Sequence, residues 1–445
     1  MRVDEGPQQR LREVTTRGLA RTKPTLLSRA LKLTVGEPVD LAAWNAARRR
    51  AYETGAFRSV DIQREVLPPA EPAPTVDSPV EESVRAAVTV QEWPPLRFRY
   101  GLEVRDELAA AGDAARGGGF GDEGASGRTL GLGLAGSLGA RGLFGRAIGA
   151  GVAARYAPGS RVVRTYLTSP LFFGKAIVST VFVERSREES GTDVASGRAA
   201  FETLKTDVTL EQRIRLARRT TLTYGYTRER NHTRRVDPDP LDFNPFDLVE
   251  TIGYFTSAAI VDTRDDPTDS TRGWFHSSSV QYAPALGSTQ RYIRSFVQQK
   301  YFRHADRVVF ATALGVGLAR GLGVPLVPSK RFFAGGGNSV RGYAEDVLTP
   351  VDLNGAAAGG DALLVFNQEV RFPVFKIVRG VGFFDAGRAF DSIGSISLAD
   401  LATAAGVGLR VQTPFVLVRV DAAMPFDGAF GPRRPRWFIS IGQMF

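Results

Sequence analysis

Few residues of this chain are of the kinds that do covalent or metal chemistry. The 445 residues include no cysteine and three histidines, His232, His276 and His304, which lie far apart in the sequence. Without cysteine there is no disulfide, no thiolate nucleophile and no cysteine-ligated zinc site. No Ser/His/Asp set and no cluster of metal-ligating residue types stands out. We therefore expect a protein that is not an enzyme and that uses no metal and no cofactor.

Two glycine-rich stretches match phosphate-binding loops only in part. The first, Gly335 to Asn338, could hold an anion but lacks the Lys and Ser/Thr of a phosphate loop. The second, Gly131, Gly133 and Gly136, has the GxGxxG spacing of a dinucleotide-binding loop. No helix is expected after it, and its glycines alternate with leucines as in a strand. Neither stretch predicts a nucleotide site.

Two charged clusters are also explained by ordinary structure. Asp262, Asp265, Asp266 and Asp269 could bind calcium, but their spacing is not that of a known calcium loop. We prefer a polar hairpin turn there. The run Arg48 to Arg50 could contact nucleic acid, but a solvated helix face is the simpler interpretation, and we expect no nucleic-acid partner.

The chain from Pro94 onward has the two-residue period of strands with one apolar face. From Leu96 to Val104 every even position is apolar, and the odd positions are charged except for Gly101. We count sixteen such segments: 94–105, 129–139, 147–157, 160–169, 175–187, 198–215, 219–229, 249–263, 272–284, 289–303, 307–320, 361–373, 379–388, 402–413, 415–425 and 436–445. The segment 198–215 could contain a bend or have different limits.

The lengths of these segments suit a membrane barrel. The stretch from Pro94 to the end has 352 residues, or 22 for each segment. A tilted spanning strand needs ~9–11 residues, which leaves about as many for each connection. The connections 106–128, 230–248 and 321–360 are long, whereas 139–146, 170–174 and 414 are short. Outer-membrane barrels have this asymmetry. The prediction is a mainly β protein with a 16-stranded antiparallel transmembrane β-barrel.

A soluble β-sandwich or propeller also alternates, and it is the main alternative. Three features disfavour it: the segments are long, aromatic residues such as Tyr156 and Trp274 lie near segment ends, and the chain stops at Phe445 inside a strand. A barrel in lipid must close its last strand on its first, because unpaired backbone groups are costly there. No run approaches the ~18 apolar residues of a spanning helix.

Residues 1–92 differ from the rest and predict a small α+β domain. Two helices are expected at Pro24–Lys32 and Leu41–Thr54, the second with Asp40 as its N-cap. Strands are expected near the start, at Phe57–Val66 and at Val84–Gln91, with a loop over 68–79. The expected order is strand, helix, helix, strand, strand, and the barrel is assigned to residues 93–445.

Five sequence blocks in the barrel region resemble the BamA/TamA superfamily of outer-membrane assembly proteins, the bacterial surface antigen barrels. The signature tetrapeptide, Val340 to Tyr343 (VRGY), lies in the longest connection. The other four, in chain order, are Asp262–Pro267 with Arg272–Gly273, Asn367–Pro373, Gly382–Gly387, and Gly406–Arg410 with Thr413–Pro414. The head resembles one POTRA domain, including Gly55 to Val60. This resemblance covers nearly the whole chain.

The resemblance gives Arg341 a specific role. An arginine on a loop folded into a barrel lumen loses water and must be paired. Glu369 and Asp385 lie on the two strands after the loop, and a guanidinium binds carboxylates through two nitrogens. The family implies the same lock between the arginine and these acids. We expect Gly342 to allow a tight turn and Tyr343 to pack on the barrel wall, next to Val340.

The resemblance also implies a function and a place in the cell. The POTRA domain, in the periplasm, would receive unfolded outer-membrane proteins by strand addition, and the seam between the first and last strands would open towards lipid. The expected partners are outer-membrane lipid, these clients and a periplasmic or inner-membrane protein. The expected seam residues are Leu96, Phe98, Tyr100 and Gly442. The C-terminal residues Trp437, Ile439, Ile441 and Phe445 resemble an assembly signal.

The alternative is a protein-secretion translocator of the same superfamily, which would pass its client through the lumen. Such translocators usually have two POTRA domains and a plug helix, neither of which is evident here. The stretch Met1 to Glu5 also lacks the apolar segment of an export signal. We therefore expect a fragment or a mis-set start, which leaves the number of POTRA domains and the BamA-like or TamA-like role open.

Overall fold

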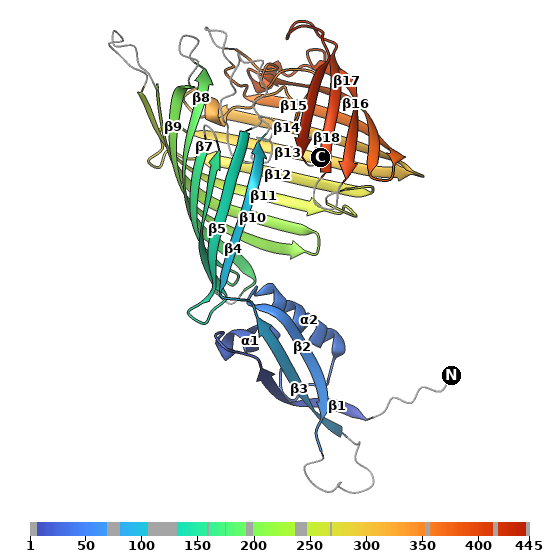
Figure 1. Cartoon of the computed structure of the whole chain (residues 1–445). Coiled ribbons are helices and arrows are strands. Elements are labelled where there is room, and N and C mark those ends of the chain that lie inside the picture. Colours follow the sequence, from blue (N-terminus) through green and yellow to red (C-terminus); the bar gives the residue numbers. More distant parts are fainter. Residues whose placement is uncertain are drawn as a thin grey trace. The chain divides into compact units, whose positions relative to one another are not determined.

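The computed structural model describes ten ranges of the chain, separated by nine gaps. The described ranges are 7–68, 81–105, 131–157, 160–173, 175–192, 199–235, 247–267, 269–351, 357–412 and 417–441. Figure 1 shows a small α+β domain at the N-terminal end of the sequence and a large curved β-sheet formed by the rest. The loop expected over 68–79 lies almost wholly outside the described residues.

The described residues of the N-terminal domain form three strands and two helices. Its elements, in chain order, are β1 (Gln8–Arg17), α1 (Pro24–Leu31), α2 (Leu41–Glu53), β2 (Phe57–Val66) and β3 (Glu81–Glu92). This is the expected order. The sheet order is β1-β3-β2, with β1 parallel and β2 antiparallel to β3. The outer strands β1 and β2 are therefore the two edges of this sheet.

Local sequence explains the two helices. Pro24 occupies the first turn of α1, where its missing N–H costs nothing. The carboxylate of Asp40 accepts the backbone N–H of Ala42 at 2.7 Å, which caps α2 as expected. Trp44 is buried with Leu11 of β1, so the apolar face of α2 closes the core.

Glu92, at the end of β3, binds the backbone of the segment between β1 and α1. Its Oε1 accepts the backbone N–H groups of Ala20, Arg21 and Thr22 at 3.2, 3.1 and 2.8 Å. Burial works against the charged carboxylate, but these backbone hydrogen bonds outweigh it and lower the pKa of Glu92 from 4.5 to about 2. Because the folded pKa lies below the unfolded one, this stabilisation is complete above pH 4.5 and is lost as the pH falls towards 2.

We expect Glu92→Gln to loosen this segment at neutral pH. An uncharged amide oxygen is a weaker acceptor than a carboxylate, so the amides of Ala20–Thr22 should lose protection in hydrogen exchange of the whole chain. The exposed Glu37→Gln is the matched control and should leave them protected. Unchanged protection in Glu92→Gln would contradict the role given to this carboxylate.

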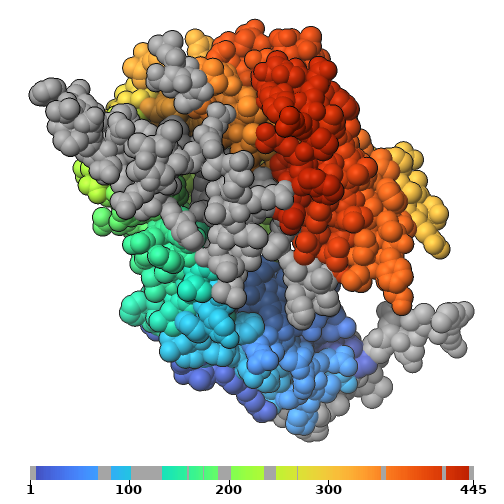
Figure 2. Space-filling view, turned by 45° about the horizontal axis from the view of Figure 1, so that its top comes forward, coloured from blue at the N-terminus to red at the C-terminus, as the bar shows by residue number. Residues whose placement is uncertain are grey.

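The remaining strands form one 16-stranded antiparallel sheet in sequence order (Figure 1). Its strands are β4 (Leu96–Arg105), β5 (Gly131–Leu143), β6 (Ile148–Ala157), β7 (Ser160–Ser169), β8 (Ile177–Thr192), β9 (Ala199–Ala217), β10 (Thr220–Arg235), β11 (Asp247–Asp262), β12 (Gly273–Ala283), β13 (Tyr292–Ala305), β14 (Val308–Gly321), β15 (Ala362–Phe375), β16 (Val378–Phe390), β17 (Ala402–Gln412), β18 (Leu417–Pro425) and β19 (Arg436–Ile441). Each of the sixteen predicted segments corresponds to one of them. In the space-filling view the C-terminal strands form a continuous surface with the strands before them (Figure 2).

The alternation read from the sequence separates the two faces of this sheet. On β14, Phe310 and Leu314 are 43% and 42% exposed, whereas Ala311 and Ala313 are 0% and 4% exposed. The first pair faces the surroundings of the barrel and the second faces its inside, as period two requires. The predicted two-faced strands are therefore confirmed.

Strand limits differ from the predicted ones mainly by extension. The segment predicted at 175–187 forms β8 as far as Thr192, and the segment at 129–139 forms β5 as far as Leu143. Hairpin ladders continue past the stretch whose hydropathy alternates, because backbone pairing does not need apolar side chains. The segment 198–215 is one continuous strand, β9, and its register with β10 shifts between Thr220 and Thr221, at the turn that joins them. Among the described residues, no helix is long and apolar enough to span a membrane.

Candidate functional site

The described part of the long connection between β14 and β15, residues 322–351 and 357–361, packs against inward-facing side chains of the sheet. Phe332, Ala334, Val340 and Leu348 of this loop are buried. They share one apolar cluster with strand residues that include Tyr292, Ala319, Leu363, Val365, Ala389, Ala402 and Ala404. The loop therefore lies inside the barrel, against β13 to β17.

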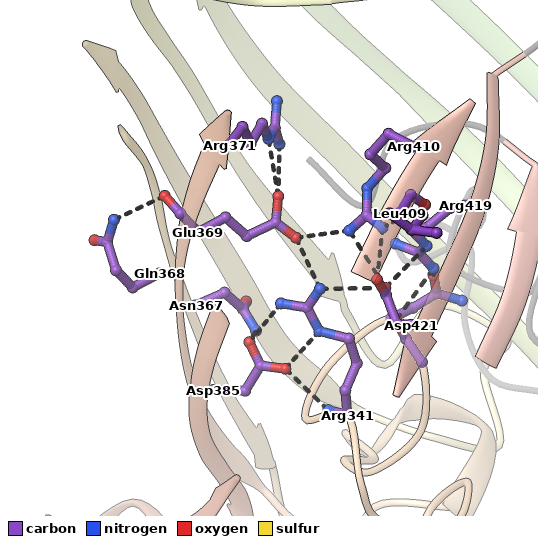
Figure 3. A network of polar contacts seen from close by, with 12 residues as sticks. Arg341, Asn367, Gln368, Glu369, Arg371, Asp385, Leu409, Arg410, Arg419 and Asp421 are labelled. Carbon is purple, nitrogen blue, oxygen red and sulfur yellow. Dashed lines mark hydrogen bonds and ion pairs between the residues drawn. The ribbon is translucent and has the colours of Figure 1, made fainter. Parts of the chain in front are cut away.

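Arg341 is the most buried charge of the loop, and the structure brings it to both acids named from the sequence (Figure 3). Its Nε and Nη2 donate to the two oxygens of Asp385 at 2.7 and 2.8 Å, and its backbone N–H donates to the same carboxylate at 3.1 Å. Its Nη1 donates to Glu369 at 2.7 Å. All three side chains are 0% exposed. The bidentate contact with Asp385 fixes the orientation of the guanidinium as well as its position.

A third acid, Asp421 on β18, completes the pocket. It accepts from Arg341 Nη1 at 3.3 Å and from Arg410 of β17 at 2.5 Å. Glu369 also accepts from Arg371 at 2.9 Å and from Arg410 at 3.1 Å. The pocket wall thus has three buried acids and, with Arg419, three buried arginines, so it is neutral before Arg341 adds its charge.

The neighbours of Arg341 in the tetrapeptide also take the expected places. Gly342 has a φ of 98°, which glycine adopts readily. The Tyr343 hydroxyl donates to the backbone carbonyl of Thr403 on β17 at 2.9 Å, and the Tyr343 ring is 2% exposed. Val340 is fully buried. The guanidinium of Arg341 lies 3.5 Å from the centre of the Phe383 ring, a cation–π contact that also excludes water.

Sequence reasoning missed most of the wall. Arg371, Arg410, Arg419 and Asp421 were not singled out, although Arg410 ends one of the five family-like blocks. A usable signal was present: these residues are charged at inward positions of strands that otherwise alternate. Gly408 belongs here too, because a Cβ on it would lie 1.9 Å from the Asp421 carboxylate.

The acidic turn between β11 and β12 is held by its own hydrogen bonds. The Asp265 carboxylate accepts from the Thr271 hydroxyl at 2.5 Å and from the backbone N–H of Arg272 at 3.1 Å. Burial opposes the charge of Asp265, but these hydrogen bonds outweigh it and hold its pKa well below the usual range. Asp269 accepts from Arg379, next to the β15–β16 turn, at 2.6 Å. The arrangement is that of a polar hairpin turn.

The seam and C-terminal residues are only partly described. β4 and β19 are the two ends of the hydrogen-bonded strand order. Trp437 and Ile439 are 60% and 45% exposed on β19, and Ile441 pairs in register with Val418 of β18. On β4, the three predicted seam residues are exposed: Leu96, Phe98 and Tyr100. Gly442 and Phe445 lie outside the described residues.

Comparisons with known proteins agree with this architecture. The chain is 29% identical over 238 residues to the outer membrane protein assembly factor BamA of Nitratidesulfovibrio vulgaris, a match that covers 51% of this chain and 30% of that protein. The chain thus matches about a third of the length of this curated relative.

Solved structures show the same fold at low sequence identity. BamA from Haemophilus ducreyi lacking POTRA domains 1–3 superposes with a TM-score of 0.75 at 16% identity, covering 99% of this chain and 85% of that one. CdiB from Acinetobacter baumannii superposes with a TM-score of 0.56 at 12% identity, covering 98% and 74%. These structures therefore share the fold of this chain, a β-barrel preceded in the sequence by a small α+β domain. The Omp85 superfamily domain matches residues 143–445, well over half of this chain, and the chain therefore belongs to the Omp85 superfamily, as its sequence blocks predicted.

Proposed function

We propose that this protein is a non-catalytic factor that assembles and inserts outer-membrane proteins. Its clients would be unfolded outer-membrane proteins, and they would enter the membrane at the seam between β4 and β19. The observation that carries the proposal is the lumen loop, which packs against the inner face of β13 to β17 and is held by a buried arginine with three acids. A loop fastened inside the barrel obstructs passage through the lumen, which favours the side of the barrel as the route for a client.

The N-terminal domain, assigned to residues 1–92, would act as a POTRA domain in the periplasm. An extended client would add a strand at the edge β2 of its sheet, because the other edge, β1, already has backbone hydrogen bonds to residues 36–39. Residues 93–445 would form the barrel, and a periplasmic or inner-membrane protein would be a further partner.

The seam would work because its strands can separate. β4 and β19 are the two ends of the strand order, so opening between them would leave the hydrogen bonds of the other strand pairs in place. Outward-facing Trp437 and Ile439 would contact lipid and help to place the closing strand.

The second candidate is a secretion translocator, because the CdiB structures share the fold. In that case the client would cross the lumen, and the loop would have to leave it. The two functions therefore predict opposite effects of a closed seam.

The experiment uses the absence of native cysteine. Pairs of cysteines, one within 96–100 of β4 and one within 437–440 of β19, are oxidised to close the seam in the full chain reconstituted in vesicles. Insertion of an unfolded barrel client should fall to background and recover on reduction, whereas a single-cysteine variant should insert clients normally. Insertion that persists with a closed seam would disprove insertion at the seam. Client transport that continues with a closed seam but requires the loop to leave the lumen would favour the translocator.

A further inference from the structure

Lys330, eleven residues before Arg341, is the second deeply buried charge of the lumen loop. It ends the short 3-10 turn Pro328–Lys330, and its side chain is 3% exposed. Its Nζ donates to both oxygens of Glu229 on β10, at 3.0 and 2.9 Å. These residues are 101 positions apart in the sequence, so tertiary folding alone brings them together.

The surroundings of Lys330 are built to hold it. Asn231 donates to Glu229 at 2.7 Å, which fixes the carboxylate, and the Lys330 ammonium lies 4.9 Å from the centre of the Tyr254 ring. Lys205 of β9 lies 3.6 Å from Glu229 and 3.4 Å from Asp207. The contacts of Lys330 therefore come from β10 and β11, with β9 behind them.

The backbone next to Lys330 is held separately. Arg294 of β13 donates from its Nε to the Lys330 carbonyl at 3.1 Å, and its guanidinium lies 4.1 Å from the centre of the Phe332 ring. Both Arg294 and Phe332 are buried. Arg294 therefore holds the backbone at Lys330 and the Phe332 ring, independently of the ion pair made by the Lys330 side chain.

The two charged contacts of the loop lie on different parts of the barrel wall. Lys330 is bound by β10, whereas Arg341 is bound by β15, β16 and β18. β10 and β16 are six places apart in the order of sixteen strands. In a closed barrel of sixteen strands, positions so far apart are on walls that face each other across the lumen.

The electrostatics of the two sites differ. The wall around Arg341 is neutral without it, as described above. The wall around Lys330 has two acids, Asp207 and Glu229, and one lysine, Lys205, so it has a net charge of −1 until Lys330 binds. Adding the nearby Glu250 and Arg294 leaves this sum unchanged. Lys330 thus neutralises the net charge of these side chains. Without Lys330 a buried negative charge would remain uncompensated, which is costly.

We propose that Lys330 is a second anchor of the lumen loop, so that the loop is a crossbar fastened to two walls by the Lys330–Glu229 pair and by the Arg341 pocket. Each anchor holds its own half of the loop, and both must open before the lumen is free. This inference does not depend on which client the barrel handles.

The test combines limited proteolysis and conductance on the full chain in lipid bilayers. Lys330→Met keeps the length of the side chain and removes the charge. Cleavage by proteinase K around residues 322–331 should rise about tenfold, since breaking one side of a buried pair is destabilising and lumen water screens part of the loss. In Arg341→Met the cleavage should lie around 334–348 instead. The double variant should be cleaved in both halves and should conduct ions more than the two single variants together.

Rescue separates an ionic anchor from a residue that only fills space. Adding Glu229→Gln to Lys330→Met makes the wall neutral again, so protection of 322–331 should return. The control is Lys376→Met, the same change at an exposed lysine of the β15–β16 turn. A boiling-dependent shift on gels checks that every barrel has folded, and Glu229→Gln alone tests the pair if Lys330→Met does not assemble. Cleavage of Lys330→Met at the rate of the Lys376→Met control, or no rescue by Glu229→Gln, would overturn the second anchor.

Discussion

Arg341→Ala is expected to abolish most of the function while leaving the barrel in the membrane. The substitution leaves Glu369, Asp385 and Asp421 in a pocket where all three are 0% exposed. Removing one partner of a buried ion pair costs roughly 3–5 kcal/mol, less where lumen water enters. The strands pair through their own backbones, so barrel abundance should fall much less than client insertion. The measurements are client insertion in vesicles and proteolysis of residues 334–348.

Arg341→Lys should restore only part of the function. An ammonium is a single point of charge and cannot reproduce the two-nitrogen contact with Asp385 together with the contact to Glu369. Double-mutant cycles should show strong coupling of Arg341 with Asp385→Asn, and weaker coupling with Asp421→Asn, whose contact is longer at 3.3 Å. The control is Arg320→Ala, an exposed arginine of β14. Purely additive effects with all three acids would refute the lock.

Gly335→Ala is expected to undock the same loop without touching any charge. Gly335 has a φ of 119°, and a Cβ there would lie 2.3 Å from the backbone oxygen of Ala344. The conformation alone costs on the order of 1–3 kcal/mol for an L-residue, and the backbone contact forces the turn to open. Since this turn precedes Val340 and Arg341, proteolysis of 334–348 should approach that of Arg341→Ala, and client insertion should fall with it.

A second glycine of the same loop provides the matched control. Gly323 has a φ of 105°, but nothing lies within 4 Å of the Cβ that alanine would add. Gly323→Ala thus imposes similar backbone strain without the close contact. It should change proteolysis around 334–348 little. If both variants release the loop equally, backbone strain and not packing decides the effect, and the role given to Gly335 is wrong.

The architecture of this protein is largely readable from its sequence because it depends on local periodicity. Alternation of apolar and polar residues fixes which face of each strand meets lipid, and it gave sixteen segments that match sixteen strands. Asp40 and Pro24 likewise mark helix starts through the backbone groups of their own turn. Strand ends were less accurate, because backbone ladders of β5 and β8 extend beyond the alternating stretch.

The Arg341 pocket was predictable in part. Glu369 and Asp385 lie on the two strands directly after the loop, so their order in the chain and a family resemblance suffice to suggest them. Asp421 is 80 residues from Arg341, and only the register of β18 against β17 brings it to the same place. A shift of that register by one residue would turn Asp421 to the opposite face.

The sequence by itself determined the number of strands and the two faces of the sheet, because both follow from residues near one another in the chain, and its resemblance to a known family pointed to the arginine that had to be paired. The tertiary structure alone decided the neutral wall around Arg341 and the contact of Lys330 with Glu229. Both depend on how far the loop reaches into the lumen and which inward side chains it meets there. These contacts depend on barrel closure and strand register, which the pattern of hydropathy along the chain does not specify.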